Sequence, residues 1–442
     1  MPLVRLPRLR RRFSTFRAAP KPHCSMARYE LISCHDCGLL HRRQPLRARE
    51  KARCVRCRCV LYRGVASSLD QMAAVVLGAA IVFAIALCSP IVELDVGGVL
   101  STATLPGAVA VLWAQQMPVV ALIVFLFTCA FPALQLGALL YVVAGLRLGV
   151  LPPGFHRLLR AVRAARHWAM IEVLMMGILI TIIKMTSLAR VSTQPGLYAF
   201  AVLTVLLAVV FAYEPRLLWN IGDDLTRPAA PPPPPGAPTL ACHACELVAV
   251  DDGAARPCCA RCGKALRRGG RAGSVARTWA LLLSAAILYV PANLLPVMYT
   301  HTLFGEEDDT IIGGVLYFWH SGSAGLATII FIASIAVPVL KLAVLSLLAL
   351  TAQRRSLWRP QQRVLLYRMV ELVGRWSMLD IFVITLTVGL VRFESLATIT
   401  AGPGALAFCA VVVLTMLASQ QFDPHLIWHP GVAVTDAGTQ SA

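Results

Sequence analysis

The sequence predicts an all-α polytopic membrane protein: eight transmembrane helices in two parallel four-helix repeats, each preceded by a small cytosolic zinc-ribbon (rubredoxin-like) module. Three observations lead to this fold class. The 442 residues are 57% hydrophobic and 14% charged, with a mean hydropathy of +0.69, and such a chain needs the bilayer as its main solvent. Four C-x-x-C pairs occur as two sets of two. Each set stands just ahead of four long apolar segments.

The chain is strongly basic, with 41 Lys and Arg against 22 Asp and Glu and a formal net charge of +19. In a soluble protein this excess would suggest nucleic acid as a partner. Here the arginines lie in connections beside apolar segments, as the positive-inside bias of membrane proteins requires, so we expect no nucleic-acid partner. Residues 1–29 are a basic tail without the apolar segment of a secretory signal, and Met26 is an alternative start.

Two cysteine-rich modules are predicted, at residues 30–64 and 240–268. Their candidate metal ligands are Cys34, Cys37, Cys54 and Cys57 in the first module and Cys242, Cys245, Cys259 and Cys262 in the second. The C-x-x-C pairs are separated by 16 and 13 residues, a spacing typical of zinc ribbons, in which two tight turns present four thiolates to one tetrahedral ion. In a reducing cytosol, clustered cysteines are expected to be ligands rather than disulfides.

We therefore expect two zinc ions, one in each module. A closed site of four thiolates has no open coordination position, which predicts a structural rather than a catalytic role. Iron in a rubredoxin-like site and a thiol redox pair are the alternatives. Cys258 is a second candidate for the ligand role of Cys259, and Cys59 has no assigned partner. Gly38 and Gly263 each follow a second cysteine, where a tight turn often needs a positive φ.

Eight apolar segments are long enough to cross a hydrocarbon core of about 30 Å as helices. The predicted spans are 70–92, 118–141, 168–189, 197–218, 276–298, 325–350, 376–393 and 405–422. They form two transmembrane repeats, 65–222 and 269–430, with a stiff proline-rich linker at 223–239 and a C-terminal tail at 431–442. Connections after the second and sixth spans and before the fifth are rich in arginine. Both termini and both zinc ribbons are therefore predicted to be cytoplasmic.

The two repeats align at an almost constant offset of 206 to 209 residues. Pro132 corresponds to Pro338, and Glu172 corresponds to Asp380. Many matches in one register indicate an internal duplication. Because each repeat has an even number of spans, both repeats are expected to have the same orientation in the membrane.

Ionisable side chains inside predicted spans are candidate functional groups, because they are costly in hydrocarbon. Lys341 in the sixth span and Asp380 in the seventh are expected at similar depth. They are a candidate pair for proton coupling or gating, with a purely structural bridge as the alternative. Pro338 falls in mid-span, where it kinks a helix for a hinge or a static bend. Gln135 stands at the position of Lys341 in the first repeat, so the symmetry is broken there.

Three motifs carry a family resemblance: Thr310-Ile-Ile-Gly-Gly-Val, Ser334-Ile-Ala-Val-Pro338-Val-Leu-Lys341 and Arg375-Trp376-Ser377-Met378-Leu379-Asp380. With the duplicated layout, they make the chain resemble the paraquat-inducible protein A family over about residues 30–430. The resemblance implies a subunit of the bacterial inner membrane that works with a periplasmic tunnel protein carrying MCE domains. Such a system moves phospholipids between inner and outer membranes and maintains envelope integrity. The candidate transport network comprises Lys341, Asp380, Glu172, Ser334 and Pro338.

Other functions remain open on the sequence alone. The sequence contains no P-loop, Rossmann fingerprint, H-E-x-x-H or G-x-S-x-G motif, so no enzymatic activity is predicted. One alternative is a membrane redox protein that couples a rubredoxin-like centre to quinone, and another is a scaffold whose ribbons recruit a partner. The chain departs from the family where Arg58, rather than the usual glycine, follows Cys57, and where Gln135 replaces a lysine.

Overall fold

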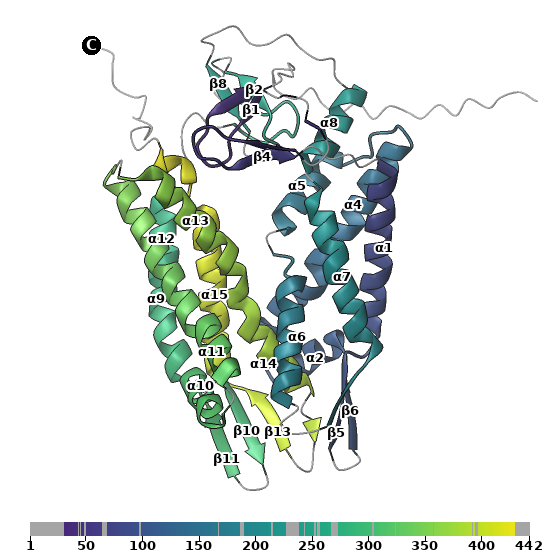
Figure 1. Cartoon of the computed structure of the whole chain (residues 1–442), viewed down its shortest axis with the longest axis vertical. Coiled ribbons are helices and arrows are strands. Elements are labelled where there is room, and N and C mark those ends of the chain that lie inside the picture. Colours follow the sequence, from purple (N-terminus) through teal and green to yellow (C-terminus); the bar gives the residue numbers. More distant parts are fainter. Residues whose placement is uncertain are drawn as a thin grey trace, which may run out of the picture.

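A computed structural model places the helices in two bundles that lie side by side, with small strands at one end and the cysteine-rich modules at the other (Figure 1). We call these the strand end and the ribbon end. The structure describes residues 31–42, 44, 46–47, 50–63, 69–96, 99–166, 168–185, 190–213, 215–226, 238–242, 244–251, 253, 257–266, 273–302, 305–322, 324–356, 358–390, 392–393 and 397–428. The basic tail at 1–29, most of the proline-rich linker and the predicted C-terminal tail lie outside the described residues.

The first bundle, residues 69–226, is called half 1. Its helices are α1 (Leu69–Cys88), α2 (Leu105–Ala114), α3 (Pro118–Phe125), the π-helix η1 (Leu126–Ala130), α4 (Phe131–Arg147), α5 (Phe155–Ala165), α6 (Ile171–Met185), α7 (Pro195–Ala212) and α8 (Pro215–Thr226). Several of them begin with proline. The N–H groups in the first turn of a helix have no acceptor within the helix, so the N–H that proline lacks costs nothing there.

The second bundle, residues 274–428, is called half 2 and repeats this order. Its helices are α9 (Ser274–Leu294), α10 (Ile311–His320), α11 (Ala324–Phe331), the π-helix η2 (Ile332–Ala336), α12 (Val337–Gln353), α13 (Pro360–Gly374), the 3₁₀-helix η3 (Arg375–Met378), α14 (Leu379–Leu390), α15 (Pro403–Gln421) and the 3₁₀-helix η4 (Pro424–Ile427).

Five helical stretches in the described part of the chain are long and apolar enough to cross a membrane. They are Leu69–Cys88, Pro118–Arg147, Ser274–Leu294, Ala327–Gln353 and Pro403–Gln421. The other three predicted spans coincide with shorter apolar helices, α6, α7 and α14. The chain is thus a largely helical membrane protein.

Between α4 and α6, helix α5 is amphipathic. Phe155, Leu159 and Val162 are buried at helical spacing, whereas Arg157 is exposed, so one face packs on the bundle and the other is charged. The helix lies at the ribbon end (Figure 1). It brings basic side chains next to the cysteine-rich modules.

Small antiparallel sheets at the strand end correct the all-α prediction. Half 1 has the strands β5 (Val92–Val96), β6 (Val99–Ala103) and β7 (Arg190–Thr193), in the order β6-β5-β7. Half 2 has β10 (Met298–Thr302), β11 (Gly305–Asp309), β12 (Arg392–Phe393) and β13 (Ala397–Ala401), in the order β11-β10-β13-β12. In half 1 the sheet joins the connection after α1 to the connection before α7, and in half 2 it joins the connection after α9 to the connection before α15.

Corresponding threonines begin the helices that follow these sheets. The Thr104 hydroxyl accepts a hydrogen bond from Gly107 N at 3.1 Å, and the Thr310 hydroxyl accepts one from Gly313 N at 3.0 Å. A Cβ added at Gly107 would lie 2.7 Å from the Thr104 hydroxyl. Glycine is therefore needed for the cap to form, which explains part of the Thr310-Ile-Ile-Gly motif.

A π-turn precedes the mid-span proline in both halves, η1 before Pro132 and η2 before Pro338. Proline has no N–H and crowds the carbonyl of the preceding turn, so the regular ladder is interrupted there. A hydroxyl sits in each π-turn: Thr128 donates to the Val124 carbonyl and Ser334 donates to the Ile330 carbonyl, both at 2.7 Å. The helix is interrupted at the same place in both bundles.

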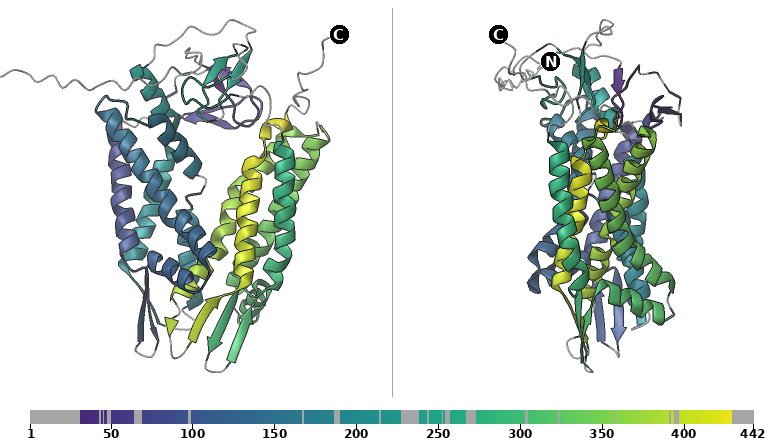
Figure 2. Two further views of the ribbon diagram at one scale, coloured as in Figure 1. Left: turned by 180° about the vertical axis from the view of Figure 1, so that it is seen from behind. Right: turned by 90° about the vertical axis from the view of Figure 1, so that its left-hand side faces the viewer.

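The two halves meet through corresponding helices. Helix α14 of half 2 packs against α6 and α2 of half 1, toward the strand end in Figure 1. Gly177 on α6 permits the close approach, because a Cβ there would lie 3.1 Å from Cβ of Phe382 on α14. At the ribbon end the bundles diverge, as the left view of Figure 2 shows.

Candidate metal centres and buried polar site

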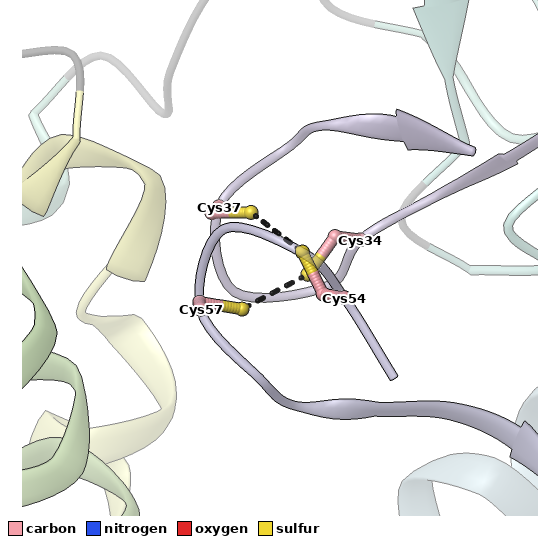
Figure 3. A group of neighbouring side chains, drawn as sticks. All are labelled: Cys34, Cys37, Cys54 and Cys57. Atoms are coloured by element: carbon pink, nitrogen blue, oxygen red, sulfur yellow. Dashed lines mark hydrogen bonds between the residues drawn. The ribbon is translucent and has the colours of Figure 1, made fainter. Parts of the chain in front are cut away.

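The first cysteine-rich module, ribbon 1, is built from two hairpins. Strands β1 (Leu31–Ser33) and β2 (Leu40–Arg42) hold the first C-x-x-C turn, and β3 (Lys51–Arg53) and β4 (Val60–Arg63) hold the second. The sulfurs of Cys34 and Cys57 are 3.4 Å apart, and those of Cys37 and Cys54 are 3.5 Å apart (Figure 3). All four thiols are buried. A tetrahedral ion with metal–sulfur bonds of about 2.3 Å needs sulfurs about 3.8 Å apart, so the cluster fits one.

Ribbon 2 forms the same cluster beside strands β8 (Thr239–Ala241) and β9 (Val248–Val250). The sulfurs of Cys242 and Cys262 are 3.5 Å apart, and those of Cys245 and Cys259 are 3.4 Å apart. Cys259, rather than its neighbour Cys258, completes the buried group of four thiols. The chain therefore has two four-cysteine clusters that can each bind one metal ion.

Each C-x-x-C pair forms the same turn. The residue after the second cysteine donates its N–H to the carbonyl of the first and adopts a left-handed φ, at Gly38 (+71°), Arg58 (+58°), Glu246 (+60°) and Gly263 (+70°). The expectation of positive φ at Gly38 and Gly263 is thus correct. Two of the four turns place a side chain in this conformation, at a cost that glycine avoids.

Sulfur contacts favour the ionised form of some thiols over their neighbours in each cluster. Hydrogen bonds with Cys37 and Cys59 lower the pKa of the Cys34 thiol, and hydrogen bonds with Cys245 and Cys259 lower the pKa of the Cys242 thiol. The same contacts raise the pKa of the partner thiols Cys37 and Cys245, and the pKa of Cys262 is lowered as well. A thiolate is the ligand form of cysteine, so the thiols with a lowered pKa are the ones prepared for metal binding.

Ribbon 1 docks on half 2 rather than on the helices that follow it. Arg368 of α13 donates from Nε to Asp36 Oδ2 at 2.8 Å and from Nη2 to the Cys57 carbonyl at 3.3 Å. Burial tends to raise the pKa of Asp36, but its hydrogen bond with His35 and the charge of Arg368 outweigh burial and lower it. His425 Nε2 also donates to the His35 carbonyl, at 2.8 Å.

Ribbon 2 docks in turn on half 1. Arg261 donates from Nε to Asp223 Oδ2 of α8 at 2.7 Å, and both side chains are almost fully buried. Arg163 of α5 bonds to the Ala244 carbonyl at 3.1 Å and to Glu246 Oε1 at 2.6 Å. The second ribbon is therefore fixed to the first bundle by two arginines.

The two docking sites use corresponding residues. Arg56 and Arg261 each precede the fourth cysteine of their four-cysteine cluster, Cys57 and Cys262. The Arg56 guanidinium lies 4.6 Å from the ring centroid of Trp428 in half 2, and the Arg261 guanidinium lies 5.9 Å from that of Trp219 in half 1. An isolated bridge between Ile32 and Leu247 links the ribbons to each other. The crossed ribbons thus connect the ribbon ends of both bundles, where the bundles diverge in Figure 2.

Within half 2, Lys341 of α12 is buried, with 1% of its surface exposed. Its Nζ lies 2.9 Å from the Thr415 hydroxyl of α15 and 3.4 Å from the Gly374 carbonyl of α13. Gly374 leaves room for the lysine stem, since a Cβ there would lie 3.3 Å from Lys341 Cε. Nothing in the sequence singles out Thr415, because an uncharged hydroxyl in an apolar span gives no signal of its own.

The remaining predicted network residues are placed as follows. Ser334 and Pro338 lie in and just after η2, on the same helical stretch as Lys341. Asp380 is in the first turn of α14, but its side chain lies outside the described residues, so the predicted Lys341–Asp380 pair stays a prediction. Glu172 is exposed in the first turn of α6.

Half 1 has a different polar group at the corresponding site. Gln135 is 2% exposed, and its Oε1 has no hydrogen-bond partner within the described part of the chain. At the offset of 208 that relates α7 to α15, Leu207 takes the place of Thr415. The acceptor that holds the lysine in half 2 is therefore replaced by an apolar side chain.

Comparison with known proteins gives consistent matches. The family model described as "Paraquat-inducible protein A" matches residues 69–222 and 275–430. The chain is 31% identical over 404 residues to the "Intermembrane transport protein PqiA" of Escherichia coli (strain K12), which covers 90% of this chain and 95% of that protein. It is 30% identical over 396 residues to the "Lipophilic envelope-spanning tunnel protein A" of the same strain, covering 89% and 90%. A "Probable intermembrane transport protein" of Haemophilus influenzae is 28% identical over 424 residues, covering 92% and 98%. No solved structure gives a significant match.

Proposed function

The chain belongs to the paraquat-inducible protein A family, and from this premise we propose that it is an inner-membrane subunit of a phospholipid transport system. In this proposal it passes lipids between inner and outer membranes together with a periplasmic MCE-domain tunnel protein and thereby maintains envelope integrity. Relatives that align over nearly their whole length bear the words intermembrane transport and envelope-spanning tunnel in their names, which supports a transport role. The chain is proposed to act as a transporter subunit and not as an enzyme.

The proposed topology has eight spans in two parallel repeats of four, with both termini and both ribbons in the cytoplasm. The basic helix α5 and the docking arginine of ribbon 2, Arg261, lie at the ribbon end, in accord with a cytoplasmic position. The proposed domains are ribbon 1 at 30–64, repeat 1 at 65–222, ribbon 2 at 240–268 and repeat 2 at 269–430.

One observation carries the proposal: a lysine is buried inside the apolar helices of half 2. An ammonium group at membrane depth is costly and is retained where it has a task. Lys341 is held by Thr415 and Gly374, which lie on two other helical segments. A change in the charge or position of Lys341 therefore alters contacts among three helices at once, α12, α13 and α15.

The same helical stretch contains the means for movement. The π-turn at Ser334 and the proline at Pro338 interrupt the ladder between the strand end and Lys341. Such interruptions act as hinges when neighbouring contacts change. We propose that protonation of Lys341, with Asp380 as its exchange partner and Glu172 as the half-1 counterpart of Asp380, biases half 2 between states that accept and release lipid.

The two ribbons are proposed to hold one zinc ion each. A buried tetrahedron of four thiolates suits zinc. Binding of the ion would contribute directly to the folding free energy of each ribbon. Because the ribbons dock crosswise, the metal-bound state fixes the ribbon ends of the two bundles relative to each other. Metal analysis of the purified protein tests this: two zinc ions per chain and no visible absorption are expected, whereas iron with a visible band would favour a redox protein.

Charge-neutral variants at the buried site test the transport proposal. We expect Lys341→Met and Asp380→Asn to abolish transfer of a fluorescent phospholipid between reconstituted vesicles carrying the partner complex, while size-exclusion profiles stay unchanged. Gln135→Leu, at the matched position in half 1, is the control and should retain transfer. Full transfer by both charge-neutral variants would refute the role of this site.

A further inference from the structure

Five thiols, not four, gather in ribbon 1. The sulfur of Cys59 lies 3.3 Å from that of Cys34, slightly closer than the 3.4 Å between Cys34 and Cys57. Ligand atoms of Asp36, Cys57 and Cys59 also lie within 4.8 Å of one another. Cys59 is half-buried, whereas the four cluster cysteines are buried. The fifth thiol thus contacts the cluster and is the one most open to solvent.

The turn itself fixes the position of Cys59. In each C-x-x-C turn, the N–H of the first cysteine donates to the carbonyl five residues later: Leu39, Cys59, Leu247 and Lys264 accept at 2.9, 2.8, 2.9 and 2.8 Å. Cys59 and Lys264 therefore occupy the same place in the second turn of their ribbons. Ribbon 1 has a thiol at this place and ribbon 2 has an amine. Ribbon 2 is therefore an internal control for the effect of the Cys59 thiol.

We propose that Cys59 makes ribbon 1 a peroxide-sensitive site: oxidation joins Cys59 to Cys34 and releases the metal ion of ribbon 1 but not that of ribbon 2. The inference rests on the proposed metal site of ribbon 1 but not on lipid transport. Solvent access and a neighbouring thiol that can resolve a sulfenic acid are two properties of oxidation-sensitive cysteines, and Cys59 has both.

The chemistry balances with hydrogen peroxide as the oxidant. The Cys59 sulfur attacks one peroxide oxygen, the O–O bond breaks, and Cys59 becomes a sulfenic acid while one water leaves. The Cys34 thiolate then attacks the Cys59 sulfur, the S–S bond forms, the S–O bond breaks, and the departing hydroxide takes a proton to become a second water. The two thiols lose two electrons and peroxide gains them. A dithiol reductant cleaves the S–S bond again.

Loss of the Cys34 thiolate acts directly on the docking site. Asp36 lies between Cys34 and Cys37 in sequence, and it is the acceptor for Arg368 of α13, which also bonds the Cys57 carbonyl. Both contacts come from the turns that a bound ion would hold in shape. Oxidation is therefore expected to loosen ribbon 1 from half 2, the half that buries Lys341.

Zinc release from the full-length, zinc-loaded protein in detergent tests the inference. Hydrogen peroxide is titrated while released zinc is measured with a chromogenic chelator, and disulfides are mapped by mass spectrometry after differential alkylation. Release from ribbon 1 is expected to be at least about tenfold faster than from ribbon 2, with a Cys34–Cys59 crosslink formed in parallel. Equal release from both ribbons, or release with no such crosslink, would overturn the proposal.

Two variants make the test independent of folding defects. Cys59→Leu places at this position the residue that Leu39 and Leu247 supply in other turns, and it should keep two ions before oxidation and retain both at the same peroxide dose. Lys264→Cys should render ribbon 2 as sensitive as ribbon 1. Wild-type sensitivity in Cys59→Leu would refute the inference. A chain that binds no metal before oxidation would instead refute the proposed metal sites, so the two failures are distinguishable.

Discussion

Half 1 and half 2 form the same local structures at corresponding positions, yet they bury different polar groups. Both have a threonine-capped helix, a π-turn ahead of a proline, and a strand pairing in the same register, with Val92 opposite Thr193 and Met298 opposite Ala401. After the π-turn, half 2 buries Lys341 and half 1 buries Gln135. The shared features stabilise a bundle, so the feature that differs is the candidate site of the proposed transport step.

The two docking sites at the ribbon end also differ, in the burial of their ion pairs. The ion pair of ribbon 2, Arg261 with Asp223, is almost fully buried, whereas Arg368 in the ion pair of ribbon 1 has 32% of its side chain exposed. The two docks thus carry ion pairs of unequal burial, made by residues that do not correspond. Ribbon 2 is expected to be the permanent attachment and ribbon 1 the weaker one.

The largest effect is expected from removal of the metal ions. It tests whether the two ribbons, which share a four-cysteine cluster, depend equally on metal. Zinc binding to small cysteine-ligated modules contributes roughly 10–16 kcal/mol to their folding at pH 7. A strong chelator should therefore abolish amide-exchange protection in the strands of both ribbons, while the long helices α1 and α9 stay protected. Because ligands must be thiolates, acid should have the same effect as the chelator. Protection that survives in either ribbon would break the equivalence of the two modules.

The next largest effect separates the two docking sites. Asp223→Ala leaves the Arg261 charge buried and unpaired, which costs about 3–5 kcal/mol, whereas Asp36→Ala breaks a more exposed pair worth about 1 kcal/mol or less. Thermal unfolding of the two variants in detergent should show the larger decrease for Asp223→Ala. The double variant Arg261→Met with Asp223→Leu is the control and should recover most of the loss. Equal decreases would show that burial does not distinguish the docks.

Much of this comparison could be predicted from the sequence, because its signals are local. The C-x-x-C spacing predicted the grouped thiols, and apolar length together with the repeat offset predicted helices at eight positions. The crossed docking could not be predicted, since Arg368 and Asp36 are far apart in the chain and meet only after both bundles have folded. The strands were missed because they are five residues or shorter and pair across the whole length of a half.

A third prediction introduces a second buried cation, in half 1. Gln135→Lys places an ammonium where Leu207 replaces the hydroxyl of Thr415, so within the described part of half 1 the charge lacks a counterpart of the Thr415 acceptor and should lower stability by about 3–5 kcal/mol. Adding Leu207→Thr should restore about 1.5–3 kcal/mol, the range of a hydrogen bond to a charged group. Chemical denaturation of the single and double variants measures both changes. A stable single variant would mean that the halves tolerate a cation equally.

The smallest effect is expected where half 2 holds its cation. Thr415→Val removes the closer of two acceptors of Lys341 and leaves the Gly374 carbonyl at 3.4 Å, so stability should fall by about 1.5–3 kcal/mol. The control is Ser419→Ala on the same helix, whose hydroxyl donates to the Met416 carbonyl of its own helix and should change stability by about 0.5 kcal/mol or less. Lipid transfer should decrease in Thr415→Val and stay unchanged in Ser419→Ala, because Thr415 contacts the Lys341 ammonium whereas the Ser419 hydroxyl bonds within its own helix. If transfer by Thr415→Val is normal while its stability falls, the hydroxyl supports the fold, and the charge of Lys341 alone distinguishes half 2 from half 1.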